Sequence, residues 1–156
     1  MISLYQCRRE HIPKVISLVE EAIEEGCFKY QFHVTDKKYA PRVFSNLLMP
    51  SFSQSNIIVA TFEGEVIGFS AFKESEFCNN FFVDGILTYV KEGFRGTGVS
   101  VRLRHKSLDS IDLVGKIVRY SVEEGNYAGE GSAKNFVDTS GLEVKKTGTC
   151  YEVRLC

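Results

Sequence analysis

The stretch YVKEGFRGTGVSVRL, residues 89–103, contains the residue types that best suit binding of an anion. Gly93, Gly96 and Gly98 follow a long apolar run and precede a segment with a helical pattern. Backbone N–H groups at the start of a helix point outward, and the helix dipole adds partial positive charge there. Glycines let a diphosphate approach the backbone, and Arg95 adds charge or fixes the loop. The alternative is a strand-to-helix turn whose glycines serve geometry alone.

Two common phosphate-binding loops do not fit this stretch. A P-loop needs a lysine directly after its last glycine, and Val99 stands at that position. A dinucleotide-binding loop of the form GxGxxG needs a glycine where Val101 stands, and it normally follows the first strand of its unit. The residues therefore argue against a P-loop nucleotide hydrolase and against a Rossmann dinucleotide site.

The same stretch resembles the acyl-CoA loop of the GNAT superfamily of N-acyltransferases. That family's loop reads Gln or Arg, two residues, Gly, one residue, then Gly or Ala, with an aromatic residue just before it and a valine five residues before the Gln or Arg. Four positions match this pattern: Val90, Phe94, Arg95 and Gly98. Two positions depart from it, because Gly93 stands near the usual proline and Ser100 replaces the final small residue with another small one.

The resemblance implies acetyl-CoA as the co-substrate and direct attack on its thioester by a primary amine in a ternary complex. It implies that the strand before the loop offers backbone groups to the pantetheine, and that the loop amides hold the pyrophosphate. The cofactor-binding residues so implied are Tyr89, Val90, Arg95, Gly96, Thr97, Gly98, Val99, Ser100 and Asn126.

Asp84 is the candidate general base, because the family often carries a carboxylate on this strand. It stands alone in the apolar segment FFVDGIL, where an unpaired charge would be costly to bury. An aspartate is shorter than the glutamate common in the family, so it would act through water. The alternative is that Asp84 caps the strand near solvent or pairs with a lysine.

The general acid that the resemblance implies is a tyrosine on the last helix, and Val137 stands at its expected position. Tyr127 is the substitute candidate, and otherwise it is a loop aromatic. A thiol with a pKa of about 8.5 is a tolerable leaving group, so an enzyme acid is not strictly required.

Three further groups of residues have a plain structural reading beside a functional one. Phe28, Tyr30, Phe32 and His33 would border the acceptor site in this family, or pack in the core. Arg102, Arg104, His105 and Lys106 could reach a CoA phosphate, but a solvated helix face is the simpler reading. Glu20, Glu21, Glu24 and Glu25 would give an acidic cleft for a basic acceptor, or a solvated face.

Hydrophobic periodicity predicts the elements that must position these residues. Strands are expected at 2–7, 57–62, 66–72, 81–90, 116–122, 142–147 and 150–155, and helices at 11–25, about 36–48, 98–109 and 133–139. The order predicts an α/β (α+β) fold: a mixed, mostly antiparallel sheet of six to seven strands flanked by about four helices. The resemblance implies that this is the GNAT-like acyl-CoA N-acyltransferase fold.

The chain of 156 residues is 44% hydrophobic and 25% charged, which predicts one globular domain over residues 1–156. A net charge of −1 argues against nucleic acid or an anionic membrane as a partner. No stretch approaches the roughly 20 apolar residues of a membrane helix, and charge by Arg8 argues against a secretory signal. The five cysteines are scattered without a CxxC or Cys/His cluster, which predicts reduced thiols, a cytoplasmic location and no metal site.

Three functions follow from these observations. The first is an acetyl-CoA-dependent N-acetyltransferase acting on an amine of a small molecule or a protein. The second is a GNAT-like domain without catalysis, used for binding or regulation, which Ser100 and the missing tyrosine favour. The third is a nucleotide-binding module unrelated to CoA. A homodimer is possible, because the last predicted hairpin offers an edge strand.

Overall fold

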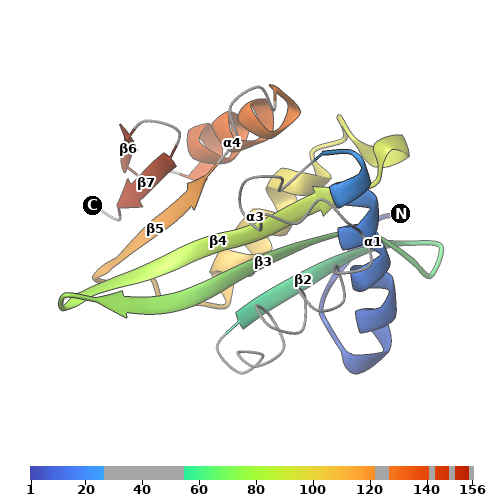
Figure 1. Ribbon diagram of the computed structural model, residues 1–156, viewed down its shortest axis with the longest axis horizontal. Helices are drawn as coiled ribbons and strands as arrows, with labels where there is room; N and C mark the ends of the chain where they lie inside the picture. Colours follow the sequence, from blue (N-terminus) through green and yellow to red (C-terminus); the bar gives the residue numbers. More distant parts are fainter. Residues whose placement is uncertain (27–54, 122–126, 141–142, 148–149, 155–156) are drawn as a thin grey trace.

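The computed structural model describes residues 1–26, 55–121, 127–140, 143–147 and 150–154, and these residues form a seven-stranded sheet with helices on both faces (Figure 1). The strands are β1 (Ser3–Gln6), β2 (Ser55–Phe62), β3 (Glu65–Phe77), β4 (Asn80–Val90), β5 (Lys116–Ser121), β6 (Glu143–Thr147) and β7 (Cys150–Arg154). The described helices are α1 (Ile12–Glu24), α3 (Val99–Asp109) and α4 (Tyr127–Ser140), with short 3-10 turns η1 (Arg9–His11) and η3 (Glu92–Phe94).

The strand order is β1-β2-β3-β4-β5-β7-β6, and every neighbouring pair is antiparallel except the parallel pair of β4 and β5. The predicted mixed, mostly antiparallel sheet is therefore confirmed. All seven predicted strands are present, although β3 continues to Phe77 rather than ending at Phe72. The helix predicted at about 36–48 lies outside the described residues.

The prediction for the last helix is wrong in extent, because α4 begins at Tyr127 rather than near Ala133. Gly129 and Gly131 made its first turns read as a loop, since glycine is a poor helix former. Packing overrides that preference further along the helix. Ala133 and Phe136 are fully buried in a cluster with residues of β3, β4 and β5.

Two tight turns join the long central strands. Glu63 and Gly64 connect β2 to β3 with φ of 50° and 82°, and Cys78 and Asn79 connect β3 to β4 with φ of 50° and 61°. Positive φ at both central residues is the type I′ geometry, whose twist matches that of the flanking strands.

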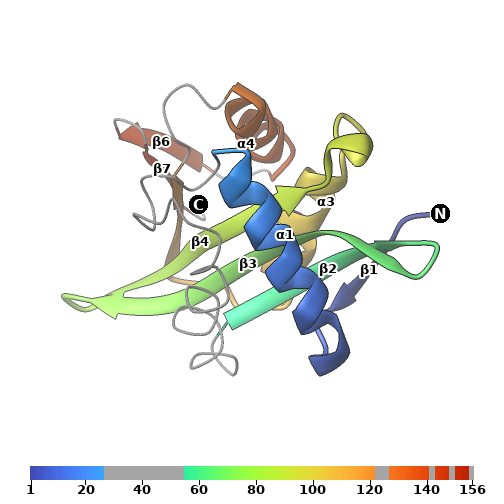
Figure 2. The same ribbon diagram turned by 45° about the vertical axis from the view of Figure 1, so that its right-hand side comes forward.

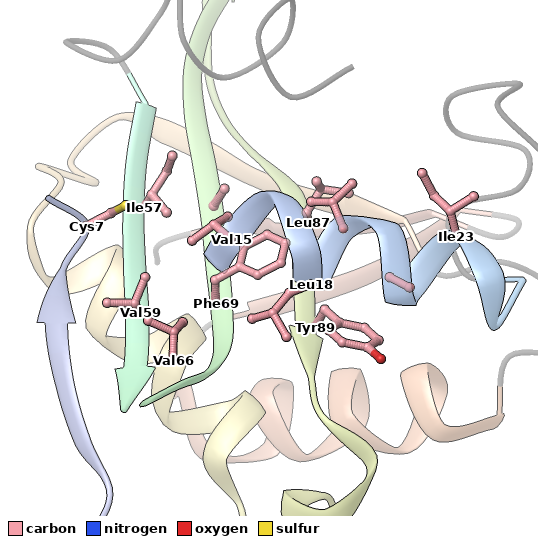
Figure 3. Packing of buried hydrophobic residues seen from close by; sticks show 13 residues of the cluster. Cys7, Val15, Leu18, Ile23, Ile57, Val59, Val66, Phe69, Leu87 and Tyr89 are labelled. Atoms are coloured by element: carbon pink, nitrogen blue, oxygen red, sulfur yellow. The ribbon is translucent and has the colours of Figure 1, made fainter. Parts of the chain in front are cut away.

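The helices divide between the two faces of the sheet. Helix α1 crosses one face, while α3 lies behind the strands in the same view (Figure 2). Under α1 the core holds Leu18 and Val15 against Phe69 and Leu87, and Tyr89 lies at the border of this cluster (Figure 3). On the opposite face, α3 buries Val99 and Leu103 and α4 buries Phe136. The apolar spacing of α1 is what the sequence pattern predicted, and α3 occupies the range expected for a helix at 98–109.

A β-bulge interrupts β4 in its middle. Phe72 of β3 pairs with Gly85, whereas the adjacent Ala71 pairs with Leu87, so Ile86 is the extra residue. A bulge shifts the alternation of side chains by one residue. Asp84 before the bulge and Tyr89 after it therefore both project towards the α1 side, although their separation is an odd number of residues.

Gly68 of β3 is a point of close backbone approach beside the end of β4. A Cβ atom there would lie 2.9 Å from the carbonyl oxygen of Tyr89 and 3.2 Å from Cγ2 of Val90. We therefore expect Gly68→Ala to lower the free energy of unfolding by about 1–3 kcal/mol, as over-packing does elsewhere. Urea unfolding of the purified protein measures this change.

Gly131→Ala is the matched control for this substitution. Gly131 lies inside α4, and a Cβ atom there would meet nothing within 4 Å. Alanine should raise the free energy of unfolding by up to about 1 kcal/mol at this position, since it forms helices better than glycine. Equal effects of the two substitutions would contradict the close approach at Gly68.

Candidate functional site

The parallel strands β4 and β5 pair over only four residues and then diverge, as Figure 1 shows. Their register runs from Phe81 opposite Lys116 to Asp84 opposite Arg119. Among the described residues, the rest of β4 up to Val90 pairs with β3 alone. Within the described part of the chain, the edge of β4 that faces β5 therefore has backbone N–H and C=O groups without a strand partner beyond Asp84. Such groups require hydrogen-bond partners, which a ligand between the two strands could supply.

The glycine-rich loop begins where β4 ends and leads directly into α3. Gly96 and Gly98 have φ of 77° and 78°, a conformation that other residues adopt only with strain. Thr97 donates its hydroxyl to the carbonyl of Phe94 at 2.7 Å, which ties the loop to itself. The glycines are thus required by the path of the backbone.

The N-terminus of α3 lacks a side-chain cap among the described residues. Its N-cap is Gly98, and the first intrahelical hydrogen bond runs from the N–H of Arg102 to the carbonyl of Gly98 at 3.0 Å. The amides of residues 99–101 consequently point out of the helix end towards the loop. Such an end attracts anions, because exposed donors and the helix dipole act in the same direction.

Ser100, which departs from the family pattern, uses its side chain in packing between helices. Its hydroxyl lies 2.7 Å from the hydroxyl of Ser132 on α4, and Arg104 donates to the same Ser132 oxygen at 2.7 Å. The serine therefore joins α3 to α4. Its side chain does not need to intrude on the loop amides, so the departure is compatible with an anion site.

Arg95 is bound from two sides by the protein itself. Its Nε donates to the carbonyl of Val90 at 2.8 Å, and its Nη2 donates to Oε2 of Glu25 at 2.6 Å. Tyr89 donates its hydroxyl to the other oxygen of Glu25 at 2.5 Å, and the guanidinium lies 5.2 Å from the centroid of the Tyr89 ring. We call these three residues the Glu25–Tyr89–Arg95 network.

The network shifts the protonation equilibria of its members. Burial alone would raise the pKa of Glu25, but hydrogen bonds from Tyr89 and Arg95 and the charge of Arg95 outweigh it and hold that pKa below its ordinary value. Burial raises the pKa of Tyr89, and its hydrogen bond to Glu25 raises it further. Glu25 is therefore ionised and Tyr89 is a neutral donor at neutral pH.

Asp84 lies at the last residue pair of the β4–β5 ladder and is held there by donors. Arg119 donates to both of its oxygens, from Nε at 2.7 Å and from Nη2 at 3.1 Å, and Ser75 donates to Oδ2 at 2.6 Å. The guanidinium of Arg119 stacks 3.6 Å above the centroid of Phe82. A carboxylate has about four lone-pair sites, so one at Oδ1 remains for water. The ion pair partner is an arginine, where the sequence suggested a lysine.

The remaining predicted residues are only partly placed. Tyr127 is the first residue of α4, and its side chain lies outside the described part of the structure, as does all of Asn126. Val137, at the family's tyrosine position, packs against the buried cluster under α4. The aromatic residues Phe28, Tyr30 and Phe32 and the neighbouring His33 also fall outside the described residues.

Sequence reasoning missed two residues that the structure brings into this region, Glu25 and Arg119. The sequence assigns Glu25 to an acidic cleft or to a solvated helix face, yet it binds Arg95 across 70 positions of sequence. One signal was present: α1 ends in glutamates without a basic residue in its last turn, where the helix dipole disfavours negative charge. Arg119 gave no signal beyond its place in an apolar strand.

The described part of the chain contains no group of His, Cys, Asp and Glu side chains that could hold a metal ion. Of the helices described, none is long and apolar enough to cross a bilayer. The Cys7 thiol is buried, which raises its pKa to about 11, so this cysteine is an inert core residue.

No family model matches the chain, and no curated protein sequence matches it. Solved structures do match over nearly its whole length. PaiA N-acetyltransferase of Thermoplasma acidophilum, in complex with coenzyme A, has a TM-score of 0.66 at 16% identity, covering 98% of this chain and 97% of its own. The GNAT family N-acetyltransferase YhbS of Escherichia coli, in complex with CoA, has a TM-score of 0.66 at 19% identity, covering 98% and 80%. A transcriptional regulator of Bacillus halodurans has a TM-score of 0.66 at 11% identity, covering 95% and 97%.

Proposed function

We propose that this chain, whose fold is that of the GNAT acetyltransferases, transfers an acetyl group from acetyl-CoA to a primary amine of a small molecule or protein. The observation that carries the proposal is the junction of three features at one place. These are the part of β4 beyond its ladder with β5, the loop with two left-handed glycines, and the start of α3, which has no side-chain cap from the residues that the structure describes. Two of the similar structures hold CoA, which has both a pantetheine arm and a pyrophosphate.

The pyrophosphate and the pantetheine arm of the cofactor then each have a partner in the chain. The pyrophosphate accepts hydrogen bonds from the loop and helix amides of Gly96, Thr97, Gly98, Val99 and Ser100. The pantetheine arm runs along β4, where the backbone from Gly85 to Val90 pairs on one side only among the described residues. Because these contacts are made by backbone groups, they tolerate the low sequence identity to the similar structures.

The chemistry consists of one acyl transfer in a ternary complex. The lone pair of the neutral amine attacks the thioester carbonyl carbon, and the nitrogen of the tetrahedral intermediate then loses its second proton to water. The oxyanion collapses to the amide carbonyl, and the C–S bond breaks to release the thiolate. An amine with a pKa of about 10.4 is mostly protonated at pH 7, so a base must first remove a proton. Asp84 accepts that proton through a water bound at its remaining lone pair, and Arg119 and Ser75 keep the carboxylate in place.

The leaving thiolate takes up a proton as CoA is released. Tyr127 at the start of α4 is the candidate donor, and bulk water is the alternative, since thiolates are good leaving groups. Positioning of the two substrates supplies much of the acceleration. Val137 in place of the family's tyrosine does not by itself prevent turnover.

Isothermal titration of the purified protein with acetyl-CoA is the first test. Micromolar binding, followed by release of free thiol with at least one member of a panel of primary amines, is the expected result. No binding by the well-folded protein would overturn the proposal. Thermal shift with ATP, GTP and NAD tests the nucleotide alternative, because a ligand at 100 times its Kd stabilises a protein by about 2.7 kcal/mol.

A second candidate function is a domain that binds CoA without turnover and serves regulation. The half-buried Val137 packs against the core where the family's acid is expected, and a transcriptional regulator of similar structure is known. Binding of acetyl-CoA with no thiol release over a broad panel of amines would favour this function over the enzyme.

A further inference from the structure

We propose that Glu25 is a positioning residue for the cofactor loop, which it controls by holding Arg95 against the end of β4. The proposal rests on the proposed function, because it concerns how the same loop binds CoA. It adds a residue from α1, far from the loop in sequence, and it changes the role of Arg95. The guanidinium acts from the protein side of the loop, and the pyrophosphate is left to the backbone amides.

The hydrogen bonds of Arg95 support this role. The bond from Nε to the carbonyl of Val90 closes the loop back onto the last residue of β4. The bond from Nη2 to Glu25 fixes the plane of the guanidinium, and the ring of Tyr89 lies beside it. An arginine held in this way orients the loop at a defined angle to the strand.

The placement of Glu25 supports the same conclusion. It is the C-cap of α1, where the helix dipole disfavours a carboxylate, and α1 has no basic residue in its last turn. Outside the helix, the guanidinium of Arg95 balances that charge, and the hydroxyl of Tyr89 adds a second hydrogen bond to the carboxylate. Each Glu25 oxygen binds one donor, so a single carboxylate connects α1, β4 and the loop.

A link of this kind works in both directions. If Glu25 strengthens CoA binding by ordering the loop, then CoA binding must stabilise the end of α1 by the same free energy. The amides of Glu25 and Gly26, which bond to Glu21 and Ile23, report on the end of that helix. CoA should therefore slow their hydrogen exchange, and Arg95→Ala should abolish that protection.

The main test compares CoA affinity, by titration, of Glu25→Ala, Glu25→Gln and Glu21→Ala. Glutamine keeps a carbonyl acceptor for Arg95 while it removes the charge, and its amide N–H can donate to the oxygen of Tyr89, which reverses that hydrogen bond. The Glu25→Gln variant should therefore bind CoA at least as tightly as the parent. Alanine releases Arg95, and the Kd should rise about tenfold, within the range seen for residues that act through a network. Glu21, one turn earlier, lies 4.0 Å from Lys91 in an exposed ion pair, and Glu21→Ala should leave the Kd within twofold.

The double variant Glu25→Ala/Arg95→Ala shows whether Glu25 acts through Arg95. Its Kd should equal that of Arg95→Ala alone, because the partner is already absent. Full additivity of the two effects would overturn the proposal, and so would equal affinity of Glu25→Ala and Glu25→Gln. If either result is found while the parent protein binds CoA normally, the role of Glu25 is overturned and the proposed function still stands. No binding by the parent overturns both.

Discussion

Asp84→Asn should lower kcat/KM for the best amine acceptor by roughly 10²–10⁴-fold at pH 7, the contribution typical of a positioned base. Asparagine has nearly the shape of aspartate and can still accept a hydrogen bond from Arg119 or Ser75, but it cannot take a proton. The deficit should shrink as pH rises towards the pKa of the acceptor, about 10.4 for an alkyl amine, because the free amine then needs no base. Steady-state kinetics from pH 7 to 10 measure both effects.

Arg119→Gln is the matched control for this prediction. It breaks the same ion pair from the other side and leaves the carboxylate of Asp84 in place. If the pair served only the fold, both variants would lose the same activity, with the same fall in unfolding midpoint and no change in pH profile. We expect instead that the loss of kcat/KM depends on pH in the Asp84→Asn variant alone. A loss of kcat/KM in that variant that is the same at every pH would contradict the role of Asp84 as the base.

Gly98→Glu should raise the Kd for acetyl-CoA by roughly 100-fold or more, because it places a negative charge beside the pyrophosphate. Gly98 is the N-cap of α3 with φ of 78°, and a Cβ atom there meets nothing within 4 Å. The space around it is open, so the substitution strains the backbone without creating a clash. Isothermal titration measures the affinity.

Gly98→Gln separates charge from backbone strain. Both side chains impose the same left-handed strain and have almost the same size, so the two variants should unfold at similar urea concentrations. Glutamine should raise the Kd by only about tenfold. If the two variants bind acetyl-CoA equally, the anion does not lie at this helix end, and the glycine serves the turn alone.

Much of this fold could be predicted from local patterns. The apolar runs at 57–62 and 66–72 predicted strands β2 and β3, because residue types within a few positions decide such elements. The beginning of α4 could not be predicted, because its glycines oppose a helix that burial of Phe136 then stabilises. The extra length of β3 follows from pairing with β4, a partner that local patterns do not reveal.

The candidate site divides in the same way. The glycine loop could be predicted because its backbone path restricts residue types within a few positions. Glu25 and Arg119 could not, because each acts on a partner that the fold brings from 70 and 35 positions away. Asp84 illustrates the intermediate case: an isolated acid in an apolar strand indicates that a partner exists, but its identity depends on which strand lies beside β4.

The short β4–β5 ladder has a consequence for how the molecule opens. Four residue pairs join β5 to β4, whereas ten join β3 to β4. The sheet is therefore joined by fewer backbone hydrogen bonds between a larger N-terminal unit, which ends with β4, and a smaller C-terminal unit, which begins with β5. Sub-global unfolding tends to begin where cooperative units share few bonds. A ligand bound beside the short β4–β5 ladder, from the β4 backbone to α4, would contact both units and would oppose their separation. Ligand binding and resistance to this local unfolding would then depend on the same few residues.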